Sequence, residues 1–279
     1  MIESQNIIYS SNAANIIQNI ISWWTSHLQV IADFDKTLTY WNQQSAIAVL
    51  YNFDYLSKDY SKKAKELESF YLPKEEDSSI PYNERKILMN QRRTKHEQLL
   101  IESWLSKKHI ENVVNSWILC LREWCHEFID KLDSLWIPLI ILSASWLWDS
   151  IAIYLQQHLE KKQWVYIISN CYTFDENWIA IKRNEPVITS LNKNETIISK
   201  KNFPEIYDKI HWRDNIILLW DKIEDLNMAD GIETNNILKI WFLNSRTEEK
   251  IQLYKQHYDI VINWKLWMQE IQKIINQFK

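Results

Sequence analysis

The chain has 279 residues, a formal net charge of −4, and 46% hydrophobic and 24% charged residues. This composition is typical of a globular protein, and the length suits one domain or a core domain with an insertion. No apolar run reaches the roughly 18 residues of a membrane span, and the first residues do not resemble a signal peptide. The weakly acidic charge offers no basic surface to nucleic acid. We therefore expect a cytoplasmic protein with neither a nucleic-acid nor a membrane partner; the sequence does not determine the oligomeric state, and we favour a monomer.

One count is unusual, because the chain has 1 glycine and 16 tryptophans. At the average usage of about 7%, a chain of this length would contain roughly 20 glycines. Glycine is the usual residue at turns, helix ends and phosphate loops, which need a positive φ or a close approach of the backbone. Either the fold avoids such positions, or many of the tryptophans are not tryptophan in the native protein.

The first half of the chain predicts mainly helices. Isoleucines at 16, 17, 20 and 21 recur at helical spacing and indicate an N-terminal helix. Residues 28–32 (LQVIA) form a short apolar run that ends at Asp33, which is typical of a buried strand. From about 43 to 132 the chain is charged and rich in leucine, isoleucine, lysine and glutamate. Apart from a loop at Pro73–Pro81, this block predicts several helices.

The second half predicts alternating strands and helices. Strand-like runs lie at Pro138–Leu142, Val165–Ser169, Asn215–Leu219, Ile237–Leu243 and Asp259–Ile262. Helical stretches lie near 149–161, 203–210, 222–229, 246–257 and 265–278. This alternation predicts an α/β fold with a parallel sheet covered on both faces. Because the helical block interrupts the strands, we expect a small helical cap, residues 43–125, inserted into a core of residues 1–42 and 126–279.

Polar side chains follow several of the predicted strands, at the edge where the carboxyl ends of parallel strands meet. In chain order they are Asp33, Asp35, Ser143, Asp221 and Asp225, and Lys193 lies in the connection before the strand that ends at Leu219. Two carboxylates two residues apart project the same way from an extended chain, and a third from a neighbouring strand would complete an oxygen site for Mg²⁺. A nearby hydroxyl and ammonium would bind phosphate oxygens. A single Asp-x-Asp is more often a turn or a helix N-cap, but this series of elements favours a catalytic site.

Residues 33–39 (DFDKTLT) resemble the opening motif of the haloacid dehalogenase (HAD) superfamily of phosphatases, Asp-x-Asp-x-Thr after a central strand. The stretches LQVIADFDKTLT, NIILLWDKIEDLNMADG, ILKIWFLNSR and HYDIVI are similar to the cytosolic pyrimidine 5′-nucleotidase family, also called cytosolic 5′-nucleotidase III. The resemblance runs from about residue 12 to the C-terminus and is weakest in the cap. It implies a Rossmann-like core with a small helical cap. It also implies Mg²⁺-dependent hydrolysis of nucleoside 5′-monophosphates, chiefly CMP and UMP.

The resemblance implies a role for each acidic residue of the core. Asp33 would attack phosphorus and become an aspartyl phosphate, and Asp35 would protonate the leaving alcohol and then deprotonate the attacking water. Asp221 would bind Mg²⁺ together with Asp33 and the backbone carbonyl of Asp35. Asp225 would support that metal site.

The resemblance also implies residues that bind the substrate. Ser143, Ala144 and Lys193 would hold the phosphoryl group. The pair Asn192-Lys193 matches the family, while Lys200 and Lys201 remain alternatives for the lysine. In the cap, the segment YLPKEED at 71–77 matches the family segment whose glutamate contacts the base. This indicates Glu75, with Glu76 as the alternative one residue away.

Two other functions stay open at this point. One is another capped phosphatase, such as a phosphoserine phosphatase, because the motif DFDKTLT is shared widely in the superfamily. The other is a non-catalytic binding protein, if tryptophans at 146, 148 and 220 block the phosphate site.

The chain departs from the family mostly by having tryptophan where the family has glycine. Trp146 and Trp148 lie between a strand and a helix, Trp220 precedes Asp221 and would crowd it, and Trp178 follows an asparagine where Asn-Gly would signal a turn. The alternative is that the tryptophans line an aromatic pocket or surface. Some bacterial lineages read UGA as glycine. We predict that most of the 16 tryptophans are encoded by UGA and are glycine in the native protein.

Overall fold

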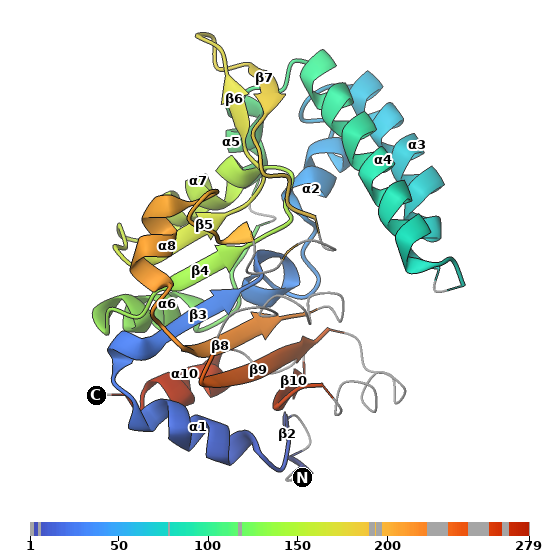
Figure 1. Cartoon of the computed structure of the whole chain (residues 1–279). Helices are drawn as coiled ribbons and strands as arrows, with labels where there is room; N and C mark the ends of the chain where they lie inside the picture. Colours follow the sequence, from blue (N-terminus) through green and yellow to red (C-terminus); the bar gives the residue numbers. More distant parts are fainter. Residues whose placement is uncertain are drawn as a thin grey trace.

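The computed structural model describes residues 3–4, 7–77, 79–116, 119–189, 193, 197–221, 234–244, 257–263 and 268–278. Its centre is an eight-stranded sheet in the order β1-β2-β10-β9-β8-β3-β4-β5 (Figure 1). The strands are β1 (Glu3–Ser4), β2 (Ile7–Tyr9), β3 (Leu28–Ala32), β4 (Leu139–Leu142), β5 (Val165–Ile168), β8 (Asn215–Trp220), β9 (Asn236–Leu243) and β10 (Ile260–Asn263). The strands from β10 to β5 are parallel, and β2 pairs antiparallel with β10 and β1. The predicted parallel sheet is confirmed, with each predicted strand within one residue of its observed bounds.

Alternate residues of the strands supply two apolar clusters, one on each face of the sheet. In β3, Val30 and Ala32 belong to the first cluster and Ile31 to the second. Helices α1 (Ala13–Ser22), α6 (Cys125–Ser134), α7 (Trp148–His158) and α10 (Gln269–Ile275) contribute to the first cluster, and α8 (Pro204–Ile210) contributes to the second. This two-sided burial explains why the parallel strands are continuous apolar runs. The helices predicted near 222–229 and 246–257 lie outside the described residues.

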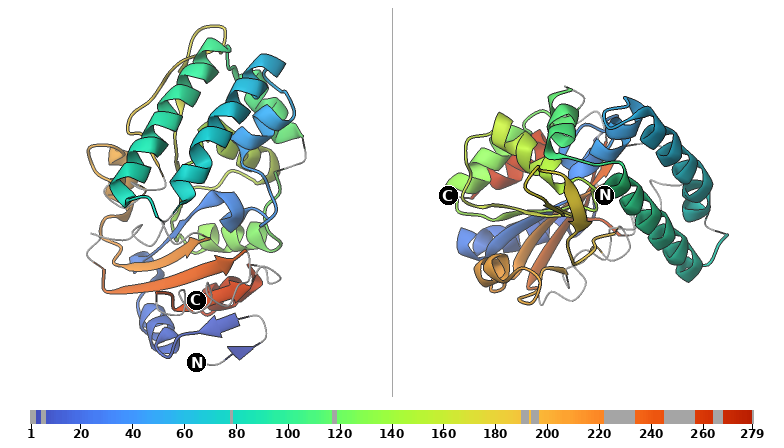
Figure 2. Two further views of the ribbon diagram at one scale, coloured as in Figure 1. Left: turned by 90° about the vertical axis from the view of Figure 1, so that its right-hand side faces the viewer. Right: turned by 90° about the horizontal axis from the view of Figure 1, so that it is seen from above.

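Four helices lie between Thr39 and Leu121 in the described part of the chain. They are α2 (Ala46–Asn52), α3 (Lys58–Glu76), α4 (Tyr82–Glu102) and α5 (Lys107–Asn115). Helices α3 and α4 lie side by side and project away from the sheet, on the side to which the arrowheads of β3, β8 and β9 point (Figures 1 and 2). The chain leaves and re-enters the core through an antiparallel bridge between Thr39 and Leu121. No helix in the described part of the chain is both long and apolar enough to span a membrane.

The predicted loop at Pro73–Pro81 is wrong at its start, because α3 continues through Pro73 to Glu76. A proline inside a helix removes one backbone hydrogen bond. Tyr71 and Glu75, which flank this proline, are both buried. Packing of α3 against α4 therefore offsets the local cost of the proline.

A two-stranded hairpin, β6 (Tyr172–Phe174) and β7 (Ala180–Arg183), was not predicted from the sequence. It packs beside the ends of α4 and α5. The amide of Ala180 donates to the carbonyl of Leu105 at 2.7 Å, and Arg183 pairs with Glu97 of α4 at 2.8 Å. The hairpin thus joins the inserted helices to a segment that follows β5.

Tryptophan occupies most of the left-handed backbone positions. Six non-glycine residues in the described ranges have positive φ, and four of them are Trp104, Trp124, Trp136 and Trp178, with φ between 57° and 66°. This conformation costs a residue with a Cβ atom roughly 1–2 kcal/mol. Trp178 lies in the turn between β6 and β7, as the Asn-Gly interpretation predicts.

Two of these tryptophans follow helix ends in the position that glycine usually takes. Trp104 lies two residues after α4, and the amide of Leu105 donates back to the carbonyl of Leu100. Trp136 lies two residues after α6, and Ile137 donates to Leu132 in the same way. This six-to-one hydrogen bond around a left-handed residue is the Schellman motif, in which glycine predominates. The backbone therefore supports glycine at these positions.

Candidate active site

Asp33 lies at the carboxyl end of β3, the central strand that pairs with both β4 and β8. Its side chain is buried, and its Oδ1 accepts the amide of Phe34 and contacts Nζ of Lys193, each at 2.7 Å. In the described part of the chain, the amide of Phe34 and the ammonium of Lys193 both contact Oδ1. A carboxylate anchored in this way through one oxygen can present the other, Oδ2, to a substrate. The sheet topology thus brings together two predicted site residues that are 160 positions apart.

The turn after Asp33 has a constrained backbone. Residues 34–38 form a tight turn in which Lys36 has a φ of 63° and a ψ of 2°. The amide of Lys36 donates to Oγ1 of Thr39 at 2.7 Å. Asp35 lies in this turn and is half-buried. The turn therefore holds the two motif carboxylates at the same edge of the sheet.

Ser143 and Ala144 follow β4, the strand next to β3. Ser143 is buried, and its Oγ accepts the amide of Ser145 at 3.1 Å. The carbonyl of Ala144 accepts hydrogen bonds from Arg93 of α4 and from Asn170. This loop lies at the same edge of the sheet as Asp33, and Arg93 ties it to the inserted helices.

Asp221 follows β8, the other neighbour of β3. Its Oδ2 accepts a hydrogen bond from Nδ2 of Asn244 at 3.0 Å. Carboxylate oxygens from the ends of two adjacent strands are a donor set that suits Mg²⁺. Among the residues that the structure describes, no group of three acidic, histidine or cysteine side chains is close enough to hold a metal. Asp225, the further predicted acidic residue, lies outside the described residues.

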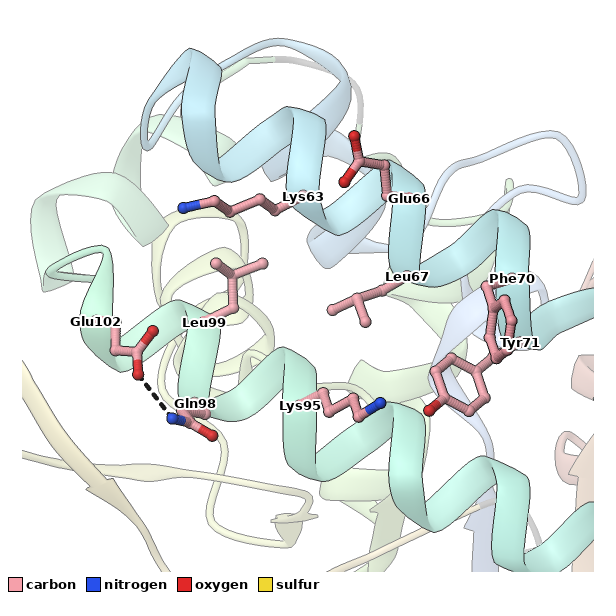
Figure 3. A pocket seen from close by; sticks show the side chains of 9 residues that line it. All are labelled: Lys63, Glu66, Leu67, Phe70, Tyr71, Lys95, Gln98, Leu99 and Glu102. Atoms are coloured by element: carbon pink, nitrogen blue, oxygen red, sulfur yellow. Dashed lines mark hydrogen bonds between the residues drawn. The ribbon is translucent and has the colours of Figure 1, made fainter.

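Glu75 lies near the end of α3, and its side chain is buried. Both of its carboxylate oxygens accept hydrogen bonds from Arg92 of α4, at 2.7 and 2.8 Å. In the described part of the chain these contacts hold the Glu75 side chain against α4, so they do not bring it into the strand-end cluster with Asp33. A pocket between α3 and α4, lined by residues such as Leu67, Tyr71 and Leu99, also contains none of the predicted site residues (Figure 3).

An aromatic cluster lies beside the loop after β4. The Tyr60 hydroxyl is 2.9 Å from Nε2 of His96, and the His96 ring lies 4.8 Å from the Trp146 ring. The guanidinium of Arg93 lies 5.0 Å from the same indole. Burial lowers the pKa of His96 from 6.5 to about 3, assisted by the nearby Arg92. His96 is therefore neutral in the folded protein.

The neutral His96 makes the protein sensitive to acid. In the unfolded chain His96 regains its ordinary pKa of 6.5, so between that pH and about 3 only the unfolded state binds the proton. We expect His96 to lower the free energy of unfolding by about 1.4 kcal/mol for each pH unit of acidification below its ordinary pKa. Between pH 7 and pH 5 this amounts to about 2 kcal/mol. Urea unfolding at both pH values measures this change. The variant His96→Gln should lose this part of the pH dependence, and the same change at exposed His211 should not; equal slopes in all three proteins would contradict it.

The expected crowding of Asp221 by Trp220 is not what the structure contains. Trp220 points into the second apolar cluster, where its ring lies 6.1 Å from the ring of Tyr258. Successive residues of a strand face opposite sides, so the indole and the Asp221 side chain diverge. The indole Nε1 of Trp220 is buried without an acceptor among the described residues, which costs roughly 1–3 kcal/mol. Tryptophan at position 220 therefore costs stability through its unpaired indole in the core, and not through crowding of Asp221.

Comparison with known proteins identifies the family. A family model described as pyrimidine 5′-nucleotidase (UMPH-1) matches residues 37–279, which begin two positions after Asp35. The chain belongs to this family. Membership confirms the resemblance that the sequence motifs indicate, and it identifies the protein as an enzyme of the 5′-nucleotidase class.

Relatives of the pyrimidine 5′-nucleotidase family extend over nearly the whole chain. A 7-methylguanosine phosphate-specific 5′-nucleotidase of Gallus gallus is 32% identical over 253 residues, which cover 88% of this chain and 86% of that protein. A crystal structure of cytosolic 5′-nucleotidase IIIB bound to cytidine superposes with a TM-score of 0.87 at 25% identity, and covers 98% of this chain and 94% of that one.

The HAD fold itself extends further than the family. A crystal structure of a probable phosphoserine phosphatase from Vibrio cholerae has a TM-score of 0.55 at 12% identity, covering 91% of this chain and 66% of that one. At this identity the likeness shows the fold alone. A crystal structure of a HAD-family hydrolase from Salmonella enterica has a TM-score of 0.58 at 13% identity and covers 89% of this chain and 71% of that one. The predicted Rossmann-like core with the HAD fold is thereby confirmed.

Three polar residues near the strand ends were missed by sequence reasoning. Arg93 binds the carbonyl of Ala144, and Arg122 and Asn244 bind the turn after Asp33. Each of them donates to at least one backbone carbonyl. The sequence signal for such contacts is weak, because any residue supplies a carbonyl and only the folded backbone decides which carbonyl is accessible.

Proposed function

We propose that the protein hydrolyses nucleoside 5′-monophosphates to nucleoside and phosphate through an aspartyl phosphate at Asp33. The contact between Asp33 Oδ1 and Lys193 at the end of the central strand, in a chain of this family, carries the proposal. In the first step Oδ2 of Asp33 bonds to phosphorus, the bond from phosphorus to O5′ breaks, and Asp35 gives its proton to O5′. In the second step water attacks the aspartyl phosphate, Asp35 takes a proton from that water, and phosphate leaves with the Asp33 carboxylate restored.

The phosphoryl group carries charge that must be neutralised in the transition state. Lys193 supplies one positive charge beside the nucleophile. The Ser143 hydroxyl and the backbone of Ala144, at the end of the adjacent strand, would bind phosphoryl oxygens. When bound, Mg²⁺ supplies further neutralisation, and the residues proposed to hold it are Asp33, Asp35 through its backbone carbonyl, Asp221 and Asp225.

Residues 43–125 would form a cap over this edge of the core, with Glu75 as the residue that contacts the base. The position of α3 and α4 beyond the carboxyl ends of the strands supports this role (Figure 1). We place the substrate in the CMP and UMP class, which the family description and the cytidine in the neighbouring structure support. The name of the Gallus gallus relative supports 7-methylguanosine monophosphate as a second candidate. The description of the structural neighbour as cytosolic supports a cytoplasmic location.

A substrate panel tests the proposal. Phosphate release is measured from CMP, UMP, 7-methylguanosine monophosphate, phosphoserine and a sugar phosphate, each with Mg²⁺ and with a chelator. We expect turnover of nucleotides only, with CMP or UMP preferred, and loss of turnover in the chelator. A preference for phosphoserine would indicate another capped phosphatase. Binding of nucleotides without turnover would indicate a non-catalytic protein.

A further inference from the structure

Two side chains outside the predicted site connect its separate parts. Arg122 lies where the chain returns from the inserted helices, and its amide donates to the carbonyl of Leu38 at 2.8 Å. Its Nε donates to the carbonyl of Thr37 at 2.8 Å, and one NH2 donates both to the carbonyl of Lys36 and to Oδ1 of Asn244. The guanidinium is buried and stacks 4.5 Å from the ring of Phe242. Burial lowers the pKa of Arg122 only to about 10, so it is charged at neutral pH.

Asn244 follows β9 and completes the connection. Its Nδ2 donates to the carbonyl of Lys36 at 3.1 Å and to Oδ2 of Asp221 at 3.0 Å. The partners fix the orientation of the amide, because a guanidinium can only donate and a carboxylate can only accept. One amide group thus links a buried cation, the turn after Asp33 and the carboxylate at the end of β8.

The carbonyl that both side chains bind belongs to a strained residue. Lys36 has a left-handed backbone, which costs a residue with a Cβ atom roughly 1–2 kcal/mol. Such a conformation persists only where the surroundings hold it. Arg122 and Asn244 approach the Lys36 carbonyl from two different segments of the chain and hold the Lys36–Thr37 peptide, the next one after the peptide that carries the Asp35 carbonyl, in one orientation.

We infer that Arg122 and Asn244 are positioning residues that fix the backbone turn after Asp35 and the Asp221 carboxylate at one separation, so that the Asp35 carbonyl at the start of this turn and Asp221 can bind the same Mg²⁺. This inference rests on the proposed function. In the described part of the chain, the side-chain hydrogen bonds of both residues are with the turn, with each other and with Asp221, and not with the proposed nucleophile Asp33. They act by restricting two oxygen donors that come from different strands, as outer hydrogen bonds do for metal ligands in general.

The test replaces Asn244 by alanine and measures Mg²⁺ binding by calorimetry without substrate. We expect the Mg²⁺ dissociation constant to rise about 10- to 100-fold. At saturating Mg²⁺ we expect kcat to fall and KM for CMP to stay unchanged. Asn236→Ala is the matched control, because Asn236 lies at the opposite end of β9 and also hydrogen-bonds a side chain, Asn215 at 2.8 Å. The control should bind Mg²⁺ like the unmodified protein.

A second variant, Arg122→Lys, keeps the charge but replaces the planar guanidinium, which donates from two separate nitrogens, with a single ammonium, and should weaken Mg²⁺ binding in the same way. Urea unfolding of each variant separates this effect from loss of the fold. If folded Asn244→Ala bound Mg²⁺ as tightly as the unmodified protein, or if Asn236→Ala lost as much affinity as Asn244→Ala, the positioning role would be wrong. The proposed function would not be affected by either result. No Mg²⁺ binding by the unmodified protein would overturn the proposed metal chemistry and the inference together.

Discussion

Replacement of Asp33 by asparagine is expected to lower kcat for phosphate release from CMP on the order of 10³-fold or more. The amide has nearly the shape of the carboxylate, but it is not a nucleophile and cannot form the aspartyl phosphate. Its oxygen can still accept the amide of Phe34 and the ammonium of Lys193, which now contact Oδ1. The substitution therefore removes the chemistry and keeps the local hydrogen bonds. The release of phosphate at saturating CMP and Mg²⁺ measures the effect.

Asp59→Asn is the matched control for this variant. Asp59 also contacts a lysine, Lys63, at 2.7 Å, but it lies exposed on α3. We expect its kcat to equal that of the unmodified protein. Urea unfolding establishes that Asp33→Asn is folded under the assay conditions. Activity of the folded Asp33→Asn protein within a factor of about ten of the original would exclude Asp33 as the nucleophile.

The parallel strands could be predicted because their signal is local. Each is a run of apolar residues that a sheet buried on both faces requires, as in residues 215–220 of β8. The hairpin β6–β7 carries no such run, since Tyr172–Phe174 and Ala180–Arg183 mix polar and apolar residues. Its position depends on contacts with α4 and α5, such as the bond from Ala180 to Leu105, which lie far away in the sequence.

The sequence predicts those site residues that directly follow a predicted strand in a recognisable motif. Asp33 and Asp221 follow adjacent strands, and the topology alone places them at one edge of the sheet. Asn244 also follows a strand, yet a single asparagine at a strand end has no specific meaning. Its importance arises from the left-handed Lys36, whose carbonyl is turned toward it. That backbone conformation is a property of the folded turn and not of any residue type in the sequence.

The second large effect concerns tryptophan at left-handed positions. Replacing Trp104, Trp124, Trp136 or Trp178 singly by glycine is expected to raise the free energy of unfolding by about 1 kcal/mol each. These side chains are exposed, so their removal gives up little buried apolar area. Glycine adopts the same backbone without the clash of a Cβ atom, although its greater freedom in the unfolded chain offsets part of the gain. Urea unfolding of a chain synthesised with tryptophan at all 16 positions provides the reference.

Trp24→Gly is the control that separates backbone strain from loss of the indole. Trp24 is 82% exposed but has a φ of −68°, which costs tryptophan nothing. Its replacement should leave the stability unchanged or lower it, because glycine only adds freedom to the unfolded chain there. If this variant gained as much stability as Trp136→Gly, the backbone argument would be wrong. The codons give an independent answer: UGG at 104, 124, 136 and 178 would exclude glycine, whereas UGA would place it where the backbone requires it. An intact mass of the native protein below that of the printed sequence, by the difference between tryptophan and glycine at each UGA codon, would identify the residue that is inserted.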